Sequence, residues 1–296
     1  MSGGAEAEFR GRVHTAVLAW YAVAGRDLPW RHPDCSPWGV YVSEIMAQQT
    51  PIARILLPWQ SWMGRWPTPA DLAAASRADV LRAWGRLGYP RRAVNLHAAA
   101  KAMVEHHAGQ VPKDPAALRA LPGVGDYTVA AVASFAFGNP LPVLDTNVRR
   151  VLARIAIGEA QAAPTPTRGE RDLAAAWLPD DCADANLWNV ASMELGALVC
   201  TARTPQCATC PVRDLCRWRT AGHPAYAGVR KRPQGYAGTD REVRGRILAL
   251  VRDDDAPHPR ADFDPCADQA RVDKLLVALI ADGLVEHSPD GYHLPR

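Results

Sequence analysis

The chain has 296 residues and a net charge of +3, and 48% of its residues are hydrophobic against 22% charged. That length fits about two domains, and the composition excludes a largely disordered or collagen-like protein. No apolar run reaches the roughly 18–20 residues that cross a bilayer, and the N-terminus lacks the apolar core of a signal peptide, so we expect a cytoplasmic protein without structural disulfides.

Alanine-rich amphipathic stretches recur along the first part of the chain and predict helices. They span residues 11–23, 37–49, 71–86, 93–106, 115–120, 127–137, 146–157 and 169–178. Ser76 and Asp114 stand at positions typical of N-caps, and Pro115 follows as a first-turn proline. No run of alternating strand residues precedes residue 285. We therefore expect an all-α body.

The C-terminal part of the chain has a different texture. Residues 223–239 are rich in Pro and Gly and indicate a linker between a main region at 1–222 and a small module at 240–296. The module has helical stretches at 241–252 and 270–281 and then alternates around Pro289-Asp-Gly291, as a β-hairpin does. This order predicts a winged-helix-like module.

Charge is distributed unevenly along the chain. Residues 240–296 hold eight basic and twelve acidic residues, a net of −4, which argues against strong phosphate binding by the module. Residues 1–239 have a net charge of +7, with basic clusters at 82–101 and 203–232. Such clusters suit a polyanion such as a nucleic acid, and a solvated helix face is the alternative.

Four of the seven cysteines form a compact C-x6-C-x2-C-x5-C pattern, made of Cys200, Cys207, Cys210 and Cys216. Four thiols within seventeen residues indicate one soft metal centre, either zinc or an iron–sulfur cluster. Zinc sites usually pair two short hooks, whereas this pattern has one. Inert cysteines are the remaining alternative, and we interpret Cys35, Cys182 and Cys266 as ordinary thiols.

The segment Leu121-Pro-Gly-Val-Gly125 joins two predicted helices. Gly123 and Gly125 allow the backbone to turn sharply and approach a ligand, and the N–H groups that open the next helix favour an anion such as a DNA phosphate. Asp145 follows twenty residues later in an apolar run that opens another helix. Taken alone, Asp145 could be a plain N-cap.

The hairpin, Asp145 and the cysteine pattern together, and in this order, resemble the helix-hairpin-helix DNA glycosylases of the endonuclease III and MutY type. The resemblance covers about residues 10–220. It implies a two-lobed all-α fold and a structural [4Fe–4S] cluster held by the four cysteines. It also implies that the cluster loop carries basic residues that meet DNA phosphates and takes no part in the glycosidic chemistry.

Two features of the sequence resemble the MutY branch. Endonuclease III-type enzymes carry a lysine two residues after the second hairpin glycine, and its amine attacks the sugar; this chain has Tyr127, which cannot form an imine. The segments 28–31 and 37–50 resemble the MutY pattern that leads to the catalytic glutamate, here Glu44. The apolar neighbours of Glu44 would keep a carboxyl group protonated near neutral pH.

The resemblance implies a role for each site residue. Glu44 would protonate the leaving adenine, and Asp145 would stabilise the oxocarbenium ion. Tyr127 and Asn147 would orient Asp145 and the attacking water, and Arg31 would help to set Glu44. The remaining residues would line the base pocket (Trp30 and Val190) or contact DNA (Gln48, Gln49, Tyr89, Arg91, Gly123 and Gly125), with Gln49 filling the stack and Tyr89 acting as a wedge beside the orphan base.

Three features depart from the family pattern. Arg86 and Pro90 replace a usual glycine and second tyrosine near the wedge. Val190 stands where MutY enzymes commonly have Gln or Glu contacting the adenine edge, and a valine can pack against a base but cannot hydrogen-bond it. The residues after the linker do not resemble the large domain that reads 8-oxoguanine in MutY enzymes.

The sequence therefore predicts a monomeric, monofunctional adenine glycosylase, nucleoid-associated if bacterial. It would flip adenine out of mismatched double-stranded DNA opposite 8-oxoguanine or guanine. A thymine or uracil glycosylase acting opposite guanine shares nearly every motif, and Val190 favours it. A non-catalytic DNA-binding homologue is a third alternative, and the presence of both Glu44 and Asp145 argues against it because phosphate binding needs neither carboxylate.

Overall fold

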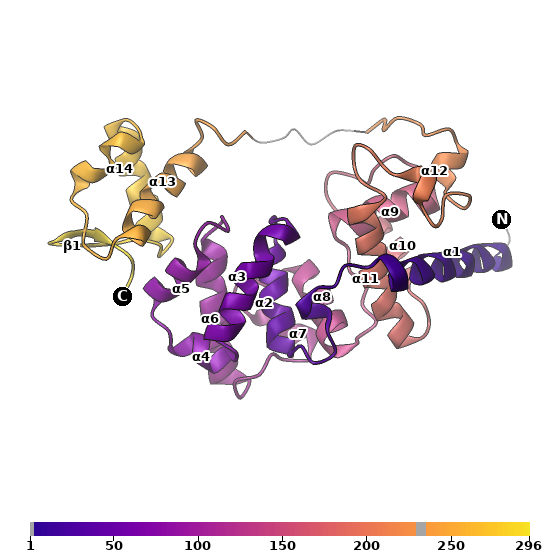
Figure 1. Cartoon of the computed structure of the whole chain (residues 1–296), viewed down its shortest axis with the longest axis horizontal. Coiled ribbons are helices and arrows are strands. Elements are labelled where there is room, and N and C mark those ends of the chain that lie inside the picture. Colours follow the sequence, from indigo (N-terminus) through magenta and orange to yellow (C-terminus); the bar gives the residue numbers. More distant parts are fainter. Residues whose placement is uncertain (1–2, 229–234) are drawn as a thin grey trace. The chain divides into compact units, whose positions relative to one another are not determined.

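The computed structural model describes residues 3–228 and 235–296, and the chain forms two compact units. Unit 1 consists of Met1–Pro33 and Asp126–Arg232, and unit 2 consists of Asp34–Gly125 and Pro233–Arg296. Figure 1 shows that both units are built almost entirely from helices, as the sequence predicted. Each unit is therefore assembled from two separate stretches of chain.

Unit 1 contains both long and short helices. They are α1 (Gly3–Ala24), η1 (Pro29–Arg31), α8 (Asp126–Phe137), α9 (Thr146–Leu152), the π-helical turn η2 (Ala153–Ile157), α10 (Arg168–Ala176), α11 (Cys182–Leu198), η3 (Cys207–Thr209) and α12 (Arg217–Thr220). Helix α11 packs against both α1 and α9. The core they share includes Val17, Val151, Trp188, Leu195, Val212 and Trp218. Val212 belongs to the cysteine loop, residues 200–216, and Trp218 belongs to α12, which directly follows it, so this loop is packed into the unit.

The helical part of unit 2 surrounds a tryptophan-rich core. Its helices are α2 (Pro37–Ala47), α3 (Ile52–Arg65), α4 (Pro69–Ala74), α5 (Arg77–Trp84), α6 (Arg91–His106) and α7 (Pro115–Ala120). The buried Trp62 ring meets Trp66 and Trp84 edge-on, with centroids 4.9 and 5.6 Å away. Aromatic pairs in this geometry add stability beyond the area that they bury. They join α3 to α5.

Polar side chains fix where several of these helices begin. Ser76 and Asp114 accept hydrogen bonds from the backbone N–H groups of Asp79 and Ala117, which confirms both predicted N-caps. Thr167 and Glu170 form a reciprocal capping box at α10. These contacts satisfy N–H groups that a helix start leaves unpaired. They are visible in the sequence because each spans only three residues.

The C-terminal residues of unit 2 form α13 (Asp240–Asp253), η4 (Arg260–Cys266), α14 (Gln269–Ala281) and the strands β1 (Glu286–Ser288) and β2 (Gly291–His293). The strands pair antiparallel with His287 opposite Tyr292, so the expected hairpin is present. Helix α13 contacts α5, and Arg252 Nη1 donates to the carbonyl oxygen of Gly85 at 2.8 Å. The expected linker at 223–239 lies partly outside the described residues.

None of the helices within residues 3–228 and 235–296 is long and apolar enough to cross a membrane. This agrees with the absence of a long apolar run from the sequence. The longest helix, α1, carries charged residues such as Glu8 and Arg12 within its span.

Candidate active site

Asp145 is the N-cap of α9, and three hydrogen bonds hold its carboxylate. Oδ1 accepts from the backbone N–H groups of Asn147 and Val148 at 2.9 and 2.6 Å, and Oδ2 accepts from Asn147 Nδ2 at 2.6 Å. Burial raises the pKa of Asp145, while these hydrogen bonds oppose the rise because they stabilise the charged form. Asp145 is therefore an N-cap, as one reading of the sequence held, and its three hydrogen bonds also fix both carboxylate oxygens in one orientation.

The loop that leads to Asp145 is anchored by Asn189, a buried residue of α11 that the sequence analysis did not single out. Its Oδ1 accepts from the Val143 N–H at 3.2 Å, and its Nδ2 donates to the Leu141 carbonyl at 2.8 Å and to Ser134 Oγ at 3.0 Å. The amide thus holds the backbone just ahead of Asp145. An asparagine between buried apolar residues is a signal that could have identified it, because a buried amide needs partners.

Arg150 connects Asn147 to the end of α11 and to the cysteine loop. Its Nη2 donates to Asn147 Oδ1 at 2.8 Å and to the Gly196 carbonyl at 2.7 Å, and its Nε donates to the Cys200 carbonyl at 2.7 Å. Burial lowers the pKa of Arg150. Asn147 is therefore held from both ends of its side-chain amide.

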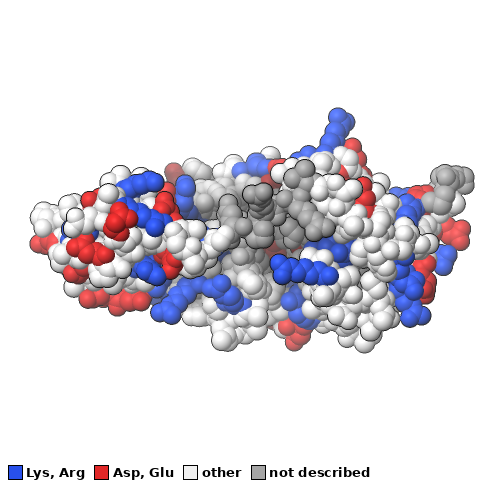
Figure 2. All heavy atoms as spheres, turned by 90° about the horizontal axis from the view of Figure 1, so that it is seen from above, with Lys and Arg blue, Asp and Glu red and all other residues white. Residues whose placement is uncertain are grey.

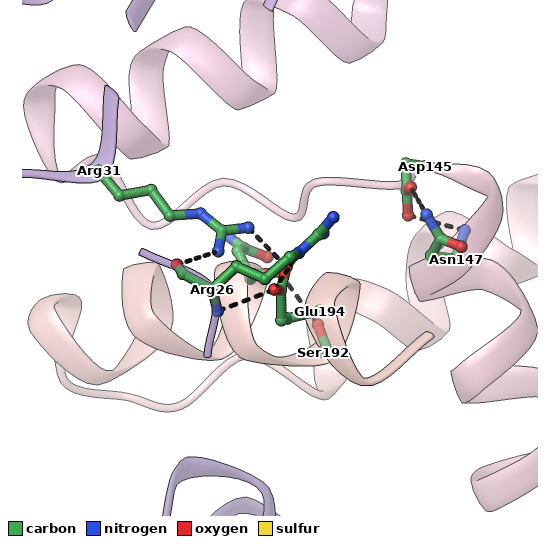
Figure 3. Close-up of polar contacts among 7 residues, drawn as sticks. Arg26, Arg31, Asp145, Asn147, Ser192 and Glu194 are labelled. Atoms are coloured by element: carbon green, nitrogen blue, oxygen red, sulfur yellow. Dashed lines mark hydrogen bonds and ion pairs between the residues drawn. The ribbon is translucent and has the colours of Figure 1, made fainter. Parts of the chain in front are cut away.

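Arg31 binds Glu194, a residue of α11 to which the sequence analysis gave no role. Arg31 Nη2 donates to Glu194 Oε2 at 2.8 Å, and Arg26 binds the same carboxylate through Nε at 2.5 Å and Nη2 at 2.8 Å (Figure 3). Burial alone would raise the pKa of Glu194, but the two arginines outweigh burial and hold that pKa at about 2. The expected role of Arg31 in setting Glu44 stays a prediction.

Glu44 lies in α2, which is buried along nearly its whole length. Its side chain is 7% exposed, and the neighbouring Val42, Ile45 and Met46 are buried as well. The helix begins at Pro37 under the Ser36 cap, whose side chain accepts from the Gly39 N–H. A glutamate in this setting is not a surface helix charge, which was the alternative open from the sequence.

Arg92 ties the end of α2 to the wedge loop, defined as residues 85–91. Its guanidinium is buried and donates to backbone oxygens of Ile45, Met46, Gln48, Leu87 and Gly88 and to Thr50 Oγ1. Burial lowers the pKa of Arg92 to about 10, which still leaves it charged at neutral pH. The sequence analysis assigned a DNA contact to its neighbour Arg91 and missed the structural part that Arg92 plays.

The residues expected to contact DNA around the wedge lie on exposed turns of unit 2. Gln49 and Tyr89 have positive φ angles of 54° and 47°, and Tyr89 is 41% exposed. Gln48 is half-buried, and its carbonyl accepts from Arg92. Arg91 is exposed and forms an ion pair with Asp282 of the C-terminal residues at 3.5 Å. A non-glycine residue at positive φ is strained and persists only where its surroundings hold it.

The hairpin Leu121–Gly125 joins α7 to α8. Gly123 has φ of 78°, and a Cβ atom added there would lie 2.7 Å from Asn95 Cβ, so only glycine fits. Gly125 is exposed and has open space around it. Tyr127 follows as the second residue of α8 and is half-buried.

The two residues assigned to the base pocket both belong to unit 1. Trp30, in η1, is buried with 8% exposure, and Val190, in α11, is half-buried. Val190 directly follows Asn189, which is occupied in holding the loop before Asp145.

The four predicted metal ligands line one pocket together with Arg154 and Trp218. Arg154 Nη1 lies 3.3 Å from Cys200 Sγ, and its backbone oxygen lies 3.5 Å from Cys216 Sγ. In the described part of the chain, no three His, Cys, Asp or Glu side chains converge on one ion. A cubane cluster takes one thiolate for each of its four irons, so its ligands surround a volume instead of one point. A donor set of four thiols beside a guanidinium fits such an anionic cluster.

Comparison with known proteins decides the family. Residues 42–179 match the model of the HhH-GPD superfamily of base excision DNA repair proteins, and residues 200–216 match the iron–sulfur binding domain of endonuclease III. The adenine DNA glycosylase of Mycobacterium tuberculosis (strain H37Rv) is 52% identical over 280 residues, which cover 94% of this chain and 91% of that protein. The chain belongs to the adenine DNA glycosylase family. Its human relative is 43% identical over 71% of this chain and 39% of that protein.

Solved structures show the same fold. A thermostable thymine-DNA glycosylase superposes with a TM-score of 0.65 at 26% identity, covering 73% of this chain and 99% of that one. An endonuclease III trapped covalently on DNA shares the fold, with a TM-score of 0.61 at 22% identity over 73% of this chain and 99% of that one. The fold matches, and the family models and the 52% identical relative together confirm an all-α helix-hairpin-helix DNA glycosylase that binds DNA and carries a [4Fe–4S] cluster, as predicted.

Proposed function

We propose that the protein is a monofunctional, monomeric glycosylase that removes adenine opposite 8-oxoguanine or guanine in double-stranded DNA. The observation that carries the proposal is the 52% identity to an adenine DNA glycosylase across 94% of the chain. The match covers 91% of the relative as well. The similarity therefore extends over nearly the whole of both chains.

The proposed chemistry uses Glu44 as the acid and Asp145 as the ionised partner. Glu44 donates a proton to adenine N7, so that the base leaves as a neutral molecule when its bond to the sugar breaks. Asp145 stabilises the positive charge that forms on the sugar, and water then adds to the same carbon. Two observations support these roles. Glu44 is buried among apolar residues, and three hydrogen bonds fix the Asp145 carboxylate before DNA binds.

The remaining site residues are proposed to orient and bind. Asn147 holds Asp145 Oδ2, and Tyr127 stands where lyase-type relatives have a nucleophilic lysine. Cys200, Cys207, Cys210 and Cys216 are proposed as the cluster ligands; a bound cluster would hold in place a loop whose arginines are proposed to contact DNA phosphates. Trp30 and Val190 are proposed to line the base pocket. Gln48, Gln49, Tyr89, Arg91, Gly123 and Gly125 are proposed to contact the duplex.

A thymine or uracil glycosylase is the second candidate. Val190 offers no hydrogen bond to an adenine edge, and a thymine/uracil-DNA glycosylase of Pyrobaculum aerophilum is 34% identical over 67% of this chain. The test is single-turnover base release from four duplexes carrying A:8-oxoguanine, A:G, T:G and U:G pairs. We expect release from the first two duplexes only. Release of thymine or uracil with no release of adenine would establish the second candidate instead.

The monofunctional part of the proposal has its own test. Because Tyr127 cannot form an imine with the sugar, the product strand is expected to stay intact until heat or alkali cleaves it. Borohydride added during turnover should trap no covalent protein–DNA adduct. Substantial trapping would show that another amine of this chain attacks the sugar and that Tyr127 does not decide the reaction type.

A further inference from the structure

Helix α13 of the C-terminal residues faces the wedge loop across a cleft of about 1000 Å³. The cleft is lined from one side by residues such as Gln49, Arg86 and Tyr89, and from the other by Tyr236, Arg241 and Arg244. Both sides belong to unit 2. The candidate wedge is therefore not built from the 34–125 stretch of unit 2 alone.

Arg241 makes a specific contact with the wedge tyrosine. Its Nη1 lies 2.8 Å from Tyr89 Oη, and its guanidinium lies over the Tyr89 ring at 5.5 Å from the centroid. The same guanidinium lies 5.1 Å from the Tyr236 ring centroid. Arg92 approaches the Tyr89 ring at 5.5 Å as well. Tyr89, with its strained positive φ, is thus held by two cations, one from each stretch of unit 2.

Arg241 differs from the other arginines of α13 in its partners. Arg244, Arg246 and Arg252 form ion pairs with the carboxylates of Asp282, Glu242 and Asp253. The recorded contacts of Arg241, in contrast, are with aromatic side chains.

The net charge of −4 for residues 240–296 does not indicate the contact between Arg241 and Tyr89, because acidic and basic side chains are interspersed on the surface of the segment (Figure 2). Charge summed over a segment says little about Arg241, the arginine of α13 that contacts Tyr89.

We propose that Arg241 is a positioning residue for Tyr89, and that the C-terminal residues thereby set discrimination between bases opposite the substrate base. This inference rests on the proposed function, in which Tyr89 contacts the duplex, and on the expected wedge role of Tyr89 beside the orphan base. An aromatic ring discriminates between stacked bases best when its orientation is fixed before binding. The hydrogen bond to the phenol and the guanidinium over the ring together fix that orientation.

The experiment compares three single variants, and Arg241→Gln is also combined with Tyr89→Ala; each protein is tested by two measurements. Arg241→Gln removes the cation, Arg241→Lys keeps a charge and a donor, and Arg260→Gln is the matched control. Arg260 lies in the same C-terminal segment, and its ion pairs are with Asp264 and Asp273. The first measurement is single-turnover adenine release from A:8-oxoguanine and A:G duplexes at sub-saturating protein. The second is the ratio of Kd values for duplexes with an uncleavable abasic analogue opposite 8-oxoguanine or guanine.

We expect Arg241→Gln to reduce both discrimination ratios roughly five- to ten-fold, as loss of one hydrogen bond and one cation–π contact implies. Arg241→Lys should lie between Arg241→Gln and the native protein, and Arg260→Gln should stay within about two-fold of the native ratios. In a Tyr89→Ala background, Arg241→Gln should change neither ratio further, because its effect passes through the ring. This last result is one that general loss of stability would not produce.

Two outcomes would overturn the inference. One is an equal loss on both duplexes, with the ratios unchanged, which would make Arg241 a simple phosphate contact. The other is that the reductions in the ratios caused by Arg241→Gln and Tyr89→Ala multiply in the double variant, which would mean that the two residues act independently. If native protein releases no adenine, the proposed function fails, and the Kd ratios still decide the role of Arg241.

Discussion

At the scale of single residues, the candidate site depends on polar groups that are held from several directions. Asp145 receives three hydrogen bonds, and Asn147 is held in turn by Arg150. Such groups cannot reorient when a substrate arrives, and electrostatic stabilisation of a transition state requires that rigidity. Substitutions that keep shape and remove charge are therefore the sharpest test of each role.

Asp145→Asn is expected to lower single-turnover base release roughly 10³-fold, because the neutral amide cannot stabilise a cationic sugar. Duplex binding should change little, since Asn is also a good N-cap. Asp181→Asn is the matched control: Asp181 caps α11 through the N–H groups of Ala183 and Asp184 and is exposed. Glu44→Gln should resemble Asp145→Asn, because an amide donates no acid proton. Native rates in either site variant would mean that the catalytic carboxylates lie elsewhere.

Glu194 provides a prediction about stability. Its pKa of about 2 lies below the ordinary 4.5, which corresponds to a contribution on the order of 3 kcal/mol to the free energy of unfolding. Glu194→Gln should therefore lower the free energy of unfolding at pH 7 by about that amount, as measured by urea unfolding. Because the folded pKa is depressed, the contribution is fully present above about pH 4.5 and is lost as pH falls toward 2. The native protein and the variant should therefore converge in acid.

The matched control for that measurement is Glu6→Gln. Glu6 pairs with Arg217 in the same unit, but both side chains are about one third exposed. A partly exposed pair contributes at most about 1 kcal/mol. An equal loss in the two variants would show that burial of Glu194 is not what strengthens its ion pairs.

The sequence identified Asp145 and the cysteines but not the roles of Glu194 and Arg92, and the reason is physical. Asp145 and the cysteines belong to compact local patterns, so their spacing carries the signal. Glu194 binds Arg31 across 163 positions, and Arg92 binds Ile45 across 47. No local pattern encodes such pairs. What the sequence offers is a charged residue within an apolar helix, which says that a partner exists and not which residue it is.

At the scale of elements, helix starts were predictable and helix contacts were not. Ser76 and Asp114 cap their helices within three residues, as the sequence indicated. Helix α11, in contrast, approaches α9 so closely that a Cβ atom added at Gly196 would lie 2.6 Å from Asn147 Cβ. The asparagine that holds Asp145 therefore rests on a glycine of another helix, and no motif connects the two.

Gly196→Ala should displace Asn147, since its new methyl group would also lie 3.0 Å from the Asn147 backbone. We expect a loss of roughly 1–3 kcal/mol in unfolding free energy, as overpacking produces, together with slower base release. Gly169→Ala is the matched control, because Gly169 lies in α10 with nothing within 4 Å. Alanine there should be neutral or stabilising by up to about 1 kcal/mol. Identical behaviour of the two variants would remove close packing as the explanation.

At the scale of the whole molecule, each unit is built from two segments of the chain that are separated in the sequence by a segment of the other unit. Unit 1 takes α1 from the start of the chain and the cysteine loop from near residue 210, and unit 2 takes α13 and α14 from its end. The all-α class was predicted because local periodicity reveals helices. How distant stretches combine was not, since that depends on contacts such as those of α1 with α11. We therefore expect a perturbation of one unit to lower the stability of that unit more than the stability of the other.

Loss of the [4Fe–4S] cluster should loosen unit 1 selectively. Val212 of the loop and Trp218 of the adjoining α12 lie in the unit 1 core, and Arg150 and Arg154 donate to backbone oxygens of the loop. We expect native protein to be yellow-brown with about four irons per chain. Cys210→Ser should lose iron, whereas Cys182→Ser should retain it, because Cys182 is exposed at the start of α11 and stands outside the pattern.

Hydrogen exchange then locates the effect of losing the cluster. In Cys210→Ser, amides of the cysteine loop, α9 and the end of α11 should exchange faster, because the loop's packing and the Arg150 and Arg154 contacts are lost together. Amides of α3 and α5, held by the Trp62 and Trp84 contact in unit 2, should keep their protection. Faster exchange in both units alike would mean that they unfold as one cooperative body. Colourless native protein that binds zinc and keeps full activity would contradict the cluster itself.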